Sequence, residues 1–537
     1  MTTLLSKNSN AVAKDRAAHA AHLISKVSLP DAFWQTFTAF RRQDHAFLLD
    51  SSLSEAECGR YSFIGAEPVA IFQAHRISPR SLPFECEIEI QRHTSCEGHM
   101  SASMPDIEKT QGDALTALRR LLHQYAVDFP QNARQQFPFL GGAVGFLGYE
   151  SGSWSGPEGS LKNSADTKIP DIYFAIYDRV LCHDNISGET FLSIVGRGKS
   201  NRSASSAAER DAQKMLEFLK KALSNEHTHR PVSSSNSDEP SERSLTAIKL
   251  TENQHSIFDE IGYCDAVRTI RKHIQAGDIY QACMTQKFKA SWGNHDPWHL
   301  YRELRAHNPA PFACLLQTPS FQIVSASPER YLSVDRSGWA ESRPIKGTRP
   351  RGDNPQHDAA LRQELAESDK DQAENVMIVD LVRNDFGRVC RFGSIDVSRL
   401  MQIETYATVF QMVSTVRGQL AADRDAIDLI RATFPGGSMT GAPKIEAMKI
   451  LNCLEPVRRG VYSGGIGYLD YAGAMDLNMV IRSLIIEGDQ VSYHAGGGVV
   501  ADSSPSAEYQ ESLDKVVALQ TALATVCSGE SAKQPAQ

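Results

Sequence analysis

Acidic side chains on two predicted helices are the first candidates for chemistry. In segment 371–385, Glu374 lies three and four residues before Met377 and Ile378, so all three side chains share one face of a helix. A carboxylate on an apolar face needs a cation or a metal ion as its partner, because an isolated buried charge is costly. An ion pair with a buried arginine would satisfy Glu374 as well as a metal would.

A second acidic group lies near the C-terminus. Pro505 suits the first turn of a helix, on which Glu508, Glu511 and Lys515 share one face. Taken alone, this pattern is typical of a solvated face with a Glu511–Lys515 ion pair. Alternatively, this helix and the helix of Glu374 could converge on one Mg²⁺ ion, which prefers oxygen ligands.

A lysine and a glutamate could act directly on a substrate. Lys346 is flanked by Arg343 and Arg349, and neighbouring positive charge makes an amine a better nucleophile. A solvated basic loop would have the same composition. Glu329 follows a predicted strand, where it could be a general acid or simply the partner of Arg330.

Three glycine-rich turns, at 435–444, 462–468 and 495–503, follow strands or precede helices. The first spaces two glycines as a phosphate-binding loop does, but Ala442 and Pro443 stand where such a loop needs Lys and then Ser or Thr. We therefore exclude nucleotide binding. Backbone N–H groups at a helix start remain suited to a carboxylate, although tight turns would explain the glycines equally well.

Composition excludes several classes of protein. The 537 residues are 41% apolar and 22% charged, which excludes a disordered, collagenous or coiled-coil chain. The net charge is −8 without long basic runs, so we expect no nucleic-acid partner. Ten cysteines without metal-type spacing indicate a reducing compartment, and no apolar run is long enough to cross a membrane. We expect a soluble cytoplasmic protein.

The elements that position these residues are mixed. Short apolar runs between Gly, Pro and Asp predict strands at 46–50, 61–65, 68–72, 139–150, 171–184, 321–334, 461–470, 478–487 and 490–501. Helical periodicity predicts helices at 113–127, 207–223, 263–276, 358–383, 424–433, 443–454 and 505–526. Strands in succession between long helices favour an α+β fold. A polar segment predicts a flexible linker and the last residues a disordered tail, which divides the chain into 1–223, 224–250, 251–526 and 527–537.

Together these motifs resemble the chorismate-utilising enzymes, a family that includes anthranilate, aminodeoxychorismate, isochorismate and salicylate synthases. The resemblance rests on GDIYQACMTQKF (277–288), NPAPF (308–312), SASPER (325–330), PIKGT (344–348), DQAENVMIVDLVRND (371–385), PGGSMTGAPK (435–444) and AGGGVVADS (495–503). FLLDSS (47–52), GRYSFIG (59–65) and GGAVGFLGYE (141–150) resemble the regulatory domain of the first two synthases. The family implies two antiparallel β-sheets packed in a sandwich with flanking helices, an anthranilate-synthase-like regulatory domain at 1–223 and a chorismate-binding catalytic domain at 251–526.

The resemblance also implies a reaction. Gln281 stands where isochorismate and salicylate synthases carry a lysine base, which implies ammonia rather than water as the nucleophile. Lys346 stands where anthranilate synthases carry alanine, which implies that its amine attacks C2 of chorismate and that ammonia then enters at C4. Glu329 would be the general acid and later the base. The product would be 4-amino-4-deoxychorismate, on the way to 4-aminobenzoate and folate.

Two features favour other functions. Gln411 stands where most of the family has a histidine, which fits an enzyme that keeps the enolpyruvyl group but also a non-catalytic paralogue that binds chorismate or tryptophan. The LLDS sequence at 48–51 resembles the tryptophan-binding LLES of anthranilate synthases, which keeps anthranilate synthase component I as an alternative. The corresponding tryptophan pocket would be formed by Ser51, Pro311, Phe312 and Ala313.

The family further implies a cofactor, a substrate site and a partner. Mg²⁺ would lie between Glu374 and Glu511, with Glu508 as a further or water-mediated ligand. The chorismate carboxylates would be bound by Tyr462, Arg482, Gly347, Thr348, Gly496, Gly497 and Gly498. Because the sequence shows no glutaminase motif, we expect a separate glutamine amidotransferase subunit to deliver the ammonia.

Overall fold

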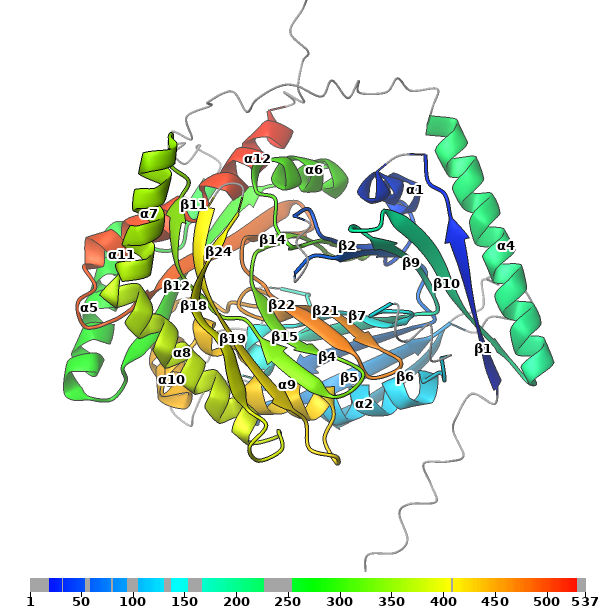
Figure 1. Ribbon diagram of the computed structural model, residues 1–537, viewed down its shortest axis with the longest axis horizontal. Coiled ribbons are helices and arrows are strands. Elements are labelled where there is room, and N and C mark those ends of the chain that lie inside the picture. The colour runs from blue at the N-terminus through cyan, green and yellow to red at the C-terminus, as the bar shows by residue number, and fades with distance from the viewer. Residues whose placement is uncertain are drawn as a thin grey trace, which may run out of the picture.

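Two large antiparallel sheets form the centre of the computed structural model (Figure 1). The structure describes residues 19–30, 32–53, 58–78, 81–93, 105–129, 137–152, 167–226, 254–406 and 409–528. Each sheet has twelve strands, and the strands of every named pair run antiparallel, which confirms the predicted α+β class. Most of the predicted linker and of the predicted tail lies outside the described residues.

Both sheets are long and twisted, and strand order differs from chain order in each. Sheet 1 runs β1 (His19–Val27), β10 (Glu189–Gly198), β9 (Arg179–Asp184), β3 (Tyr61–Gly65), β2 (Phe47–Asp50), β13 (Phe312–Gln317), β14 (Gln322–Ser327), β23 (Ser483–Glu487), β24 (Gln490–Val499), β12 (Gln281–Ser291) and β11 (Gln254–Ser256), and β20 (Gly441–Ala442) pairs with β12. Sheet 2 runs β17 (Ile345–Pro350), β19 (Val409–Gln419), β16 (Trp339–Ser342), β15 (Arg330–Val334), β22 (Met475–Met479), β21 (Gly465–Asp470), β7 (Gly142–Leu147), β8 (Ile172–Tyr177), β4 (Ala70–Arg76), β5 (Glu85–Arg92) and β6 (Asp106–Asp113), and β18 (Asp396–Thr405) pairs with β19.

The two halves of the chain interleave within each sheet. In sheet 1, β2 from the first half pairs with β13 from the second, with Leu48 opposite Leu315. In sheet 2, β7 pairs with β21, with Phe146 opposite Ile466. Neither half therefore has a sheet of its own, and the division into a regulatory and a catalytic domain stays a prediction about function.

Three segments that were predicted as single strands are each two strands. Segments 171–184, 321–334 and 478–487 each leave one sheet and enter the other. A polar residue stands at each crossing: Asp178, Glu329 and Arg482. Two of these crossings lie side by side. The Met479 N–H donates to the Glu329 carbonyl oxygen (3.0 Å), and the Ala326 N–H donates to the Arg482 carbonyl oxygen (3.1 Å).

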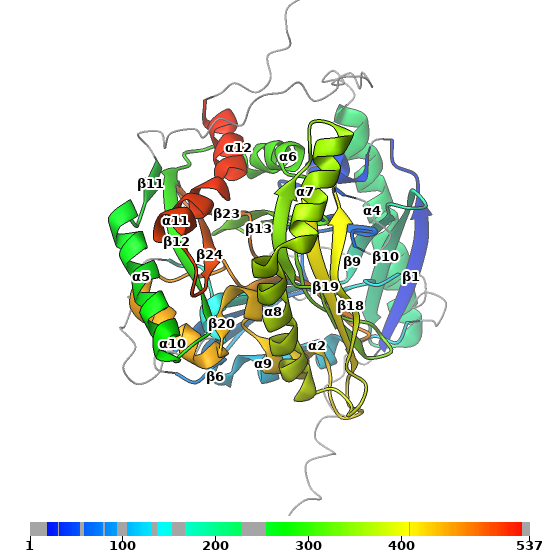
Figure 2. The ribbon, with the colours of Figure 1, turned by 60° about the vertical axis from the view of Figure 1, so that its left-hand side comes forward.

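Helices surround the sheets, as Figures 1 and 2 show. They are α1 (Phe37–Phe40), α2 (Ala114–Tyr125), α4 (Asn201–Glu226), α5 (Glu260–Ala276), α6 (Pro297–His307), α7 (Pro355–Glu367), α8 (Asp369–Gly387), α9 (Ala426–Thr433), α10 (Lys444–Leu454), α11 (Pro505–Asp514) and α12 (Val517–Cys527). The predicted helices 358–383 and 505–526 are each two helices. The first breaks at Ser368, which ends α7 and caps α8 by accepting a hydrogen bond from the Asp371 N–H (3.3 Å).

The main hydrophobic core lies between the sheets. Phe47 of sheet 1 packs edge-on against Tyr177 of sheet 2, with 4.6 Å between ring centroids, and Phe63 meets Tyr468 at 5.5 Å. A second core covers the other face of sheet 1 and includes Trp298 of α6. Within the described ranges, no helix has both the length and the apolar character needed to cross a membrane.

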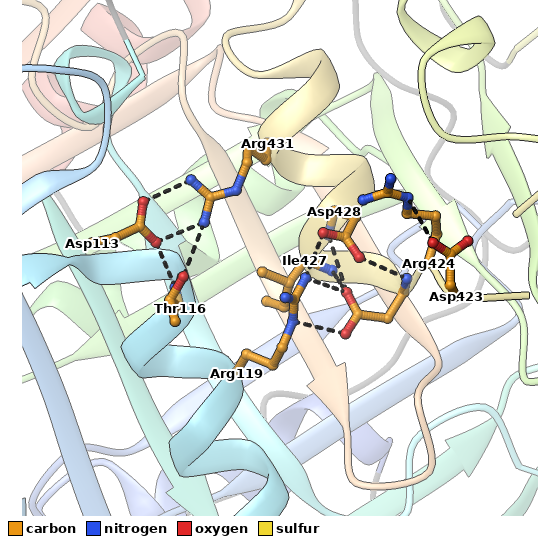
Figure 3. Close-up of polar contacts among 9 residues, drawn as sticks. Asp113, Thr116, Arg119, Asp423, Arg424, Ile427, Asp428 and Arg431 are labelled. Carbon is orange, nitrogen blue, oxygen red and sulfur yellow. Dashed lines mark hydrogen bonds and ion pairs between the residues drawn. The ribbon is translucent and has the colours of Figure 1, made fainter. Parts of the chain in front are cut away.

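Ion pairs join a helix of the first half to a helix of the second (Figure 3). Arg119 on α2 reaches Asp425 (2.9 Å) and Asp428 (2.7 Å) at the start of α9. Arg431 on α9 contacts Asp113 at the start of α2 with two hydrogen bonds of 2.6 Å. Each helix thus begins with a carboxylate that the other helix neutralises, an arrangement that also suits the helix dipoles.

Arg119→Met should lower the free energy of unfolding by about 1–2 kcal/mol near neutral pH, because it leaves the largely buried Asp428 without its cation. Burial raises the pKa of Asp428, but the hydrogen bond and charge of Arg119, the Asp425 N–H and the charge of Arg424 together outweigh burial and hold that pKa below its ordinary value of 3.8. This contribution is therefore present above that value and is lost as the pH falls through the lower pKa of the folded state.

Denaturant unfolding of both proteins near neutral pH and in acid measures this difference. The control is Arg383→Met, which removes a solvent-exposed pair with Asp380 on α8 and should change stability by less than about 0.5 kcal/mol. Equal effects of the two substitutions would contradict a stabilising contact between the halves.

Candidate active site

Lys346 is presented by a β-bulge in β17. The pairing with β19 shifts by one residue between Ile345 and Thr348, and Gly347 has a φ of +83°, where a side chain is disfavoured. A bulge re-aims the side chains beside it, which takes Lys346 out of the regular alternation of the strand. Its Nζ lies 3.7 Å from Glu374 Oε2, and only 13% of the lysine side chain is exposed.

The two arginines that flank Lys346 in the sequence have carboxylate partners. Arg343 pairs with Glu404, and Arg349 pairs with Asp371 at 3.1 Å. Each guanidinium charge is therefore balanced by its own carboxylate. The structure places Lys346 beside a carboxylate, whereas the sequence predicted crowding by these two cations.

Glu329 lies at the crossing between β14 and β15, and 6% of it is exposed. Burial raises the pKa of this carboxyl to about 7. The charge of Lys346 and hydrogen bonds from the Ser438 side chain and the Ile345 N–H offset burial only in part. Near neutral pH Glu329 is thus present in both protonation states, as a group that first donates and then accepts a proton requires.

Glycines in β24 let side chains from two helices approach the same strand. A Cβ on Gly497 would lie 2.8 Å from Glu508 Oε2, which comes from α11. A Cβ on Gly498 would lie 2.1 Å from Gln281 Nε2 and 3.4 Å from Glu374 Oε2, which comes from α8. The glycines of the predicted motif 495–503 therefore leave room for the acidic side chains, because a larger residue there would collide with them.

Lysines balance the carboxylates. Lys515 Nζ lies 2.6 Å from Glu511, and Lys370 Nζ lies 4.0 Å from Glu374 and 3.8 Å from Glu508. The predicted Glu511–Lys515 ion pair is thus present, and it forms part of the site. Burial raises the pKa of Glu508. Burial also acts on Glu511, but Lys515, Lys370 and Lys346 together outweigh it and lower the pKa of Glu511.

The oxygen donors suit Mg²⁺, but they are spread out. Glu508 is 3% exposed, and its Oε2 has no hydrogen-bond partner in the described part of the chain. The Oε1 of Gln281 is likewise buried and unpartnered there. No three His, Cys, Asp or Glu side chains among the described residues lie close enough to hold one metal ion. The residue types fit Mg²⁺, and the ligand set stays a prediction.

The two glutamines that distinguish this sequence are both buried. Gln281 begins β12 and is 1% exposed, so its amide faces the protein interior beside Gly498. Gln411 lies in β19 directly opposite Thr348 of β17, the strand that carries Lys346. Both amides thus lie next to residues of the predicted substrate site.

Arg482 and Tyr462, the predicted carboxylate-binding residues, lie at or next to residues with a positive φ angle. Arg482 has a φ of +52° and Ser463 a φ of +65°, conformations that cost on the order of 1 kcal/mol for residues other than glycine and that are common at functional sites. The Arg482 guanidinium donates to the Lys515 carbonyl oxygen (2.7 Å). Tyr462, next to Ser463, stacks on His494 at 4.9 Å.

The predicted tryptophan-pocket residues share one cavity of about 270 Å³. Its lining includes Ser51, Pro311, Phe312, Ala313 and Arg330. Ser51 is fixed there because its hydroxyl donates to the Pro311 carbonyl oxygen (3.1 Å). The neighbouring Asp50, which replaces the glutamate of the usual pattern, accepts hydrogen bonds from Tyr301 and Arg305.

The sequence analysis did not identify Ser438, which hydrogen-bonds to Glu329, or Lys370, which lies beside Glu374 and Glu508. Lys370 lies four residues before Glu374 on one helix, a spacing that predicts contact and could have revealed it. Ser438 lies in a short 3₁₀ turn far from Glu329 in the sequence, and no local pattern links the two.

Comparisons with known proteins identify the family of the chain. The family described as chorismate binding enzyme matches residues 86–521. Aminodeoxychorismate synthase component 1 of Bacillus subtilis is 35% identical over 92% of this chain and 95% of its own length. The chloroplastic aminodeoxychorismate synthase of Arabidopsis thaliana is 36% identical over 95% of this chain, which spans only 53% of that relative. The crystal structure of anthranilate synthase component I from Streptococcus pneumoniae has a TM-score of 0.67 and 27% identity, covering 87% of this chain and 93% of that one.

The chain therefore belongs to the chorismate binding enzyme family. Some relatives are much longer than the part that it matches: it spans about half of the Arabidopsis protein. The match covers both halves of the chain, in agreement with sheets that both halves build.

The pKa of Glu329 predicts a pH-dependent stability. The folded-state value of about 7 lies above the ordinary 4.5, so Glu329 costs no stability below 4.5 and destabilises the fold increasingly as the pH rises to about 7. Glu329→Gln should therefore be more stable than the wild type by about 1–3 kcal/mol at about pH 8, and should lose this advantage at about pH 5.

Denaturant unfolding of both proteins at the two pH values gives this difference. Glu209→Gln, an exposed position on α4, is the control and should show no such pH dependence. A Glu329→Gln advantage that is the same at both pH values would mean that Glu329 titrates normally.

Proposed function

We propose that the chain is the chorismate-aminating component of an aminodeoxychorismate synthase, which replaces the C4 hydroxyl of chorismate with an amino group. The observation that carries this proposal is the position of Lys346. The bulge of β17 holds its amine beside Glu374, and its charge acts on the pKa of Glu329. The names of the Arabidopsis and Bacillus relatives support it.

The reaction consists of two allylic displacements. The amine of Lys346 forms a bond to C2 of chorismate while both double bonds of the ring diene shift and the C4–O bond breaks. Glu329 gives its proton to the leaving hydroxyl, which departs as water. Ammonia then bonds to C4, both double bonds shift back and the C2–N bond breaks, which regenerates the lysine amine. The carboxylate of Glu329 takes the proton that the incoming ammonia loses.

The other site residues bind and orient chorismate. Arg482 and Tyr462 hold the enolpyruvyl carboxylate, since a guanidinium can contact both of its oxygens. Gly347, Thr348 and the N–H groups of 496–498 bind the ring carboxylate. Glu374 and Glu511, with Glu508, would hold Mg²⁺, which would supply positive charge to neutralise that carboxylate and favour departure of the hydroxyl.

The rival function is that of anthranilate synthase component I, with the same substrate aminated at C2. The cavity beside Ser51 favours it only in part, because a tryptophan bound there would serve either synthase as a regulatory or structural ligand. A chorismate- or tryptophan-binding paralogue without turnover is the third possibility, and the buried Gln411 is the feature that supports it.

Product analysis distinguishes the three functions. Purified protein with chorismate, Mg²⁺ and ammonium should give a product that added aminodeoxychorismate lyase converts to 4-aminobenzoate. Lys346→Ala should lower this activity by about 100-fold or more, because the covalent step is lost, and amination that remains should move to C2. Lys346→Arg keeps the charge without a free amine and should be equally impaired.

Each other outcome of the product analysis has a definite meaning. Anthranilate as the wild-type product would establish the rival function, and absence of any product from folded protein would indicate the paralogue. An unchanged product and rate in Lys346→Ala would refute the role of Lys346 as nucleophile.

A separate glutamine amidotransferase subunit is the proposed source of ammonia. The Bacillus relative is named a component 1, which supports a second component. Ammonia is mostly protonated near neutral pH, and a docked subunit could deliver the reactive NH₃ directly. The reaction would take place in the cytoplasm, and the nine described cysteines, all without disulfide bonds, are compatible with that reducing compartment.

The isolated chain should use ammonium but not glutamine. Its rate with a fixed ammonium concentration should rise with pH in proportion to the NH₃ fraction, within the range where the protein stays folded. Glutamine should support turnover only after a glutamine amidotransferase component is added. Turnover of glutamine by the isolated chain would show that no partner is needed.

A further inference from the structure

We infer that Lys370 competes with a divalent cation for Glu374 and Glu508, and so sets the affinity of the site for its metal ion. The inference rests on the proposed assignment of Mg²⁺ to Glu374 and Glu511. It concerns a lysine outside the catalytic and substrate-binding residues, on the first turns of α8.

The geometry places one ammonium group between carboxylates of two helices. Lys370 Nζ lies 4.0 Å from Glu374 Oε1 on its own helix and 3.8 Å from Glu508 Oε1 on α11. The other oxygen of Glu508 is buried and lacks a hydrogen-bond partner among the described residues. A 3%-exposed carboxylate with one such oxygen, facing the strand at Gly497, is a strong acceptor for a cation.

Of the lysines at this site, Lys370 is the one that can withdraw. Lys346 is 13% exposed. Lys515 is anchored twice, by Glu511 at 2.6 Å and by the Gly496 carbonyl oxygen at 2.8 Å. Lys370 is 53% exposed and lies at about 4 Å from its carboxylates, so its flexible chain can turn into water at small cost. A metal ion would displace it most easily.

Competition follows from charge. A divalent ion bound by Glu374 would repel an ammonium group a few ångströms away, and it must also take over the carboxylates that Lys370 neutralises. Removal of the lysine charge should therefore tighten metal binding. Because Lys370 is half exposed and can move away, solvent screening limits the gain, and we expect about three- to tenfold.

The test measures binding, so it does not depend on turnover. The probe is Mn²⁺, a divalent cation that takes oxygen ligands and whose free concentration is read from its EPR signal. Titrations of the full-length chain should give an about three- to tenfold lower dissociation constant for Lys370→Met than for the wild type. Lys370→Arg keeps the charge and should stay within about twofold of the wild type. Lys221→Met, on the distant helix α4 (Figure 1), removes the same net charge elsewhere and should change nothing.

Glu374→Gln separates this inference from the proposed function. If that substitution leaves Mn²⁺ binding unchanged, the metal assignment itself is wrong and the role of Lys370 falls with it. If Glu374→Gln weakens binding but Lys370→Met does not tighten it, only the role of Lys370 is overturned. Equal tightening by Lys370→Met and Lys221→Met would also overturn it, because net charge alone would then explain the effect. Thermal unfolding of each variant checks that it is folded.

Discussion

The paired crossings at Glu329 and Arg482 are the constraint on which the site depends. At these points the chain passes between the sheets in opposite directions, and two backbone hydrogen bonds hold the crossings together. Within a strand, side chains alternate between the core and the opposite face of the sheet. A residue at a crossing lies outside both strands, so its side chain is not bound to either direction. Glu329 and Arg482, the proposed general acid and carboxylate-binding residue, are therefore positioned by backbone that hydrogen bonds hold in place.

Charge balance is the second condition. Glu374, Glu508 and Glu511 approach one glycine-rich strand, and such a group of carboxylates is stable only with cations close by. Three lysines from β17, α8 and the end of α11 supply that charge. The same lysines differ in exposure, so the protein separates a buried amine that can react from an exposed one that can move away.

Local patterns predicted the elements and the candidate residues well, but not their spatial relations. The spacing around Glu374 correctly placed it on the inward face of a helix, and the glycine motif at 495–503 correctly marked a strand of close contacts. The crossings in 171–184, 321–334 and 478–487 were missed although a polar residue stands at each of them. One polar residue in an apolar run does not distinguish a change of sheet from an outward-facing position in a single strand. The ion pair of Arg343 with Glu404 could not be predicted, because Glu404 belongs to another strand and sequence proximity gives no direction.

The interleaving of the halves has a consequence for synthesis on the ribosome. Strand β2 is made early, but the backbone of Leu48 finds its partner only when Leu315 has emerged. Until then β2 and β7 present unpaired, apolar edges, and such edges invite pairing with other chains. Contacts of such high sequence separation also form slowly, because a long loop must close first. The nascent first half is thus the stage of synthesis at which these edges can pair with other chains.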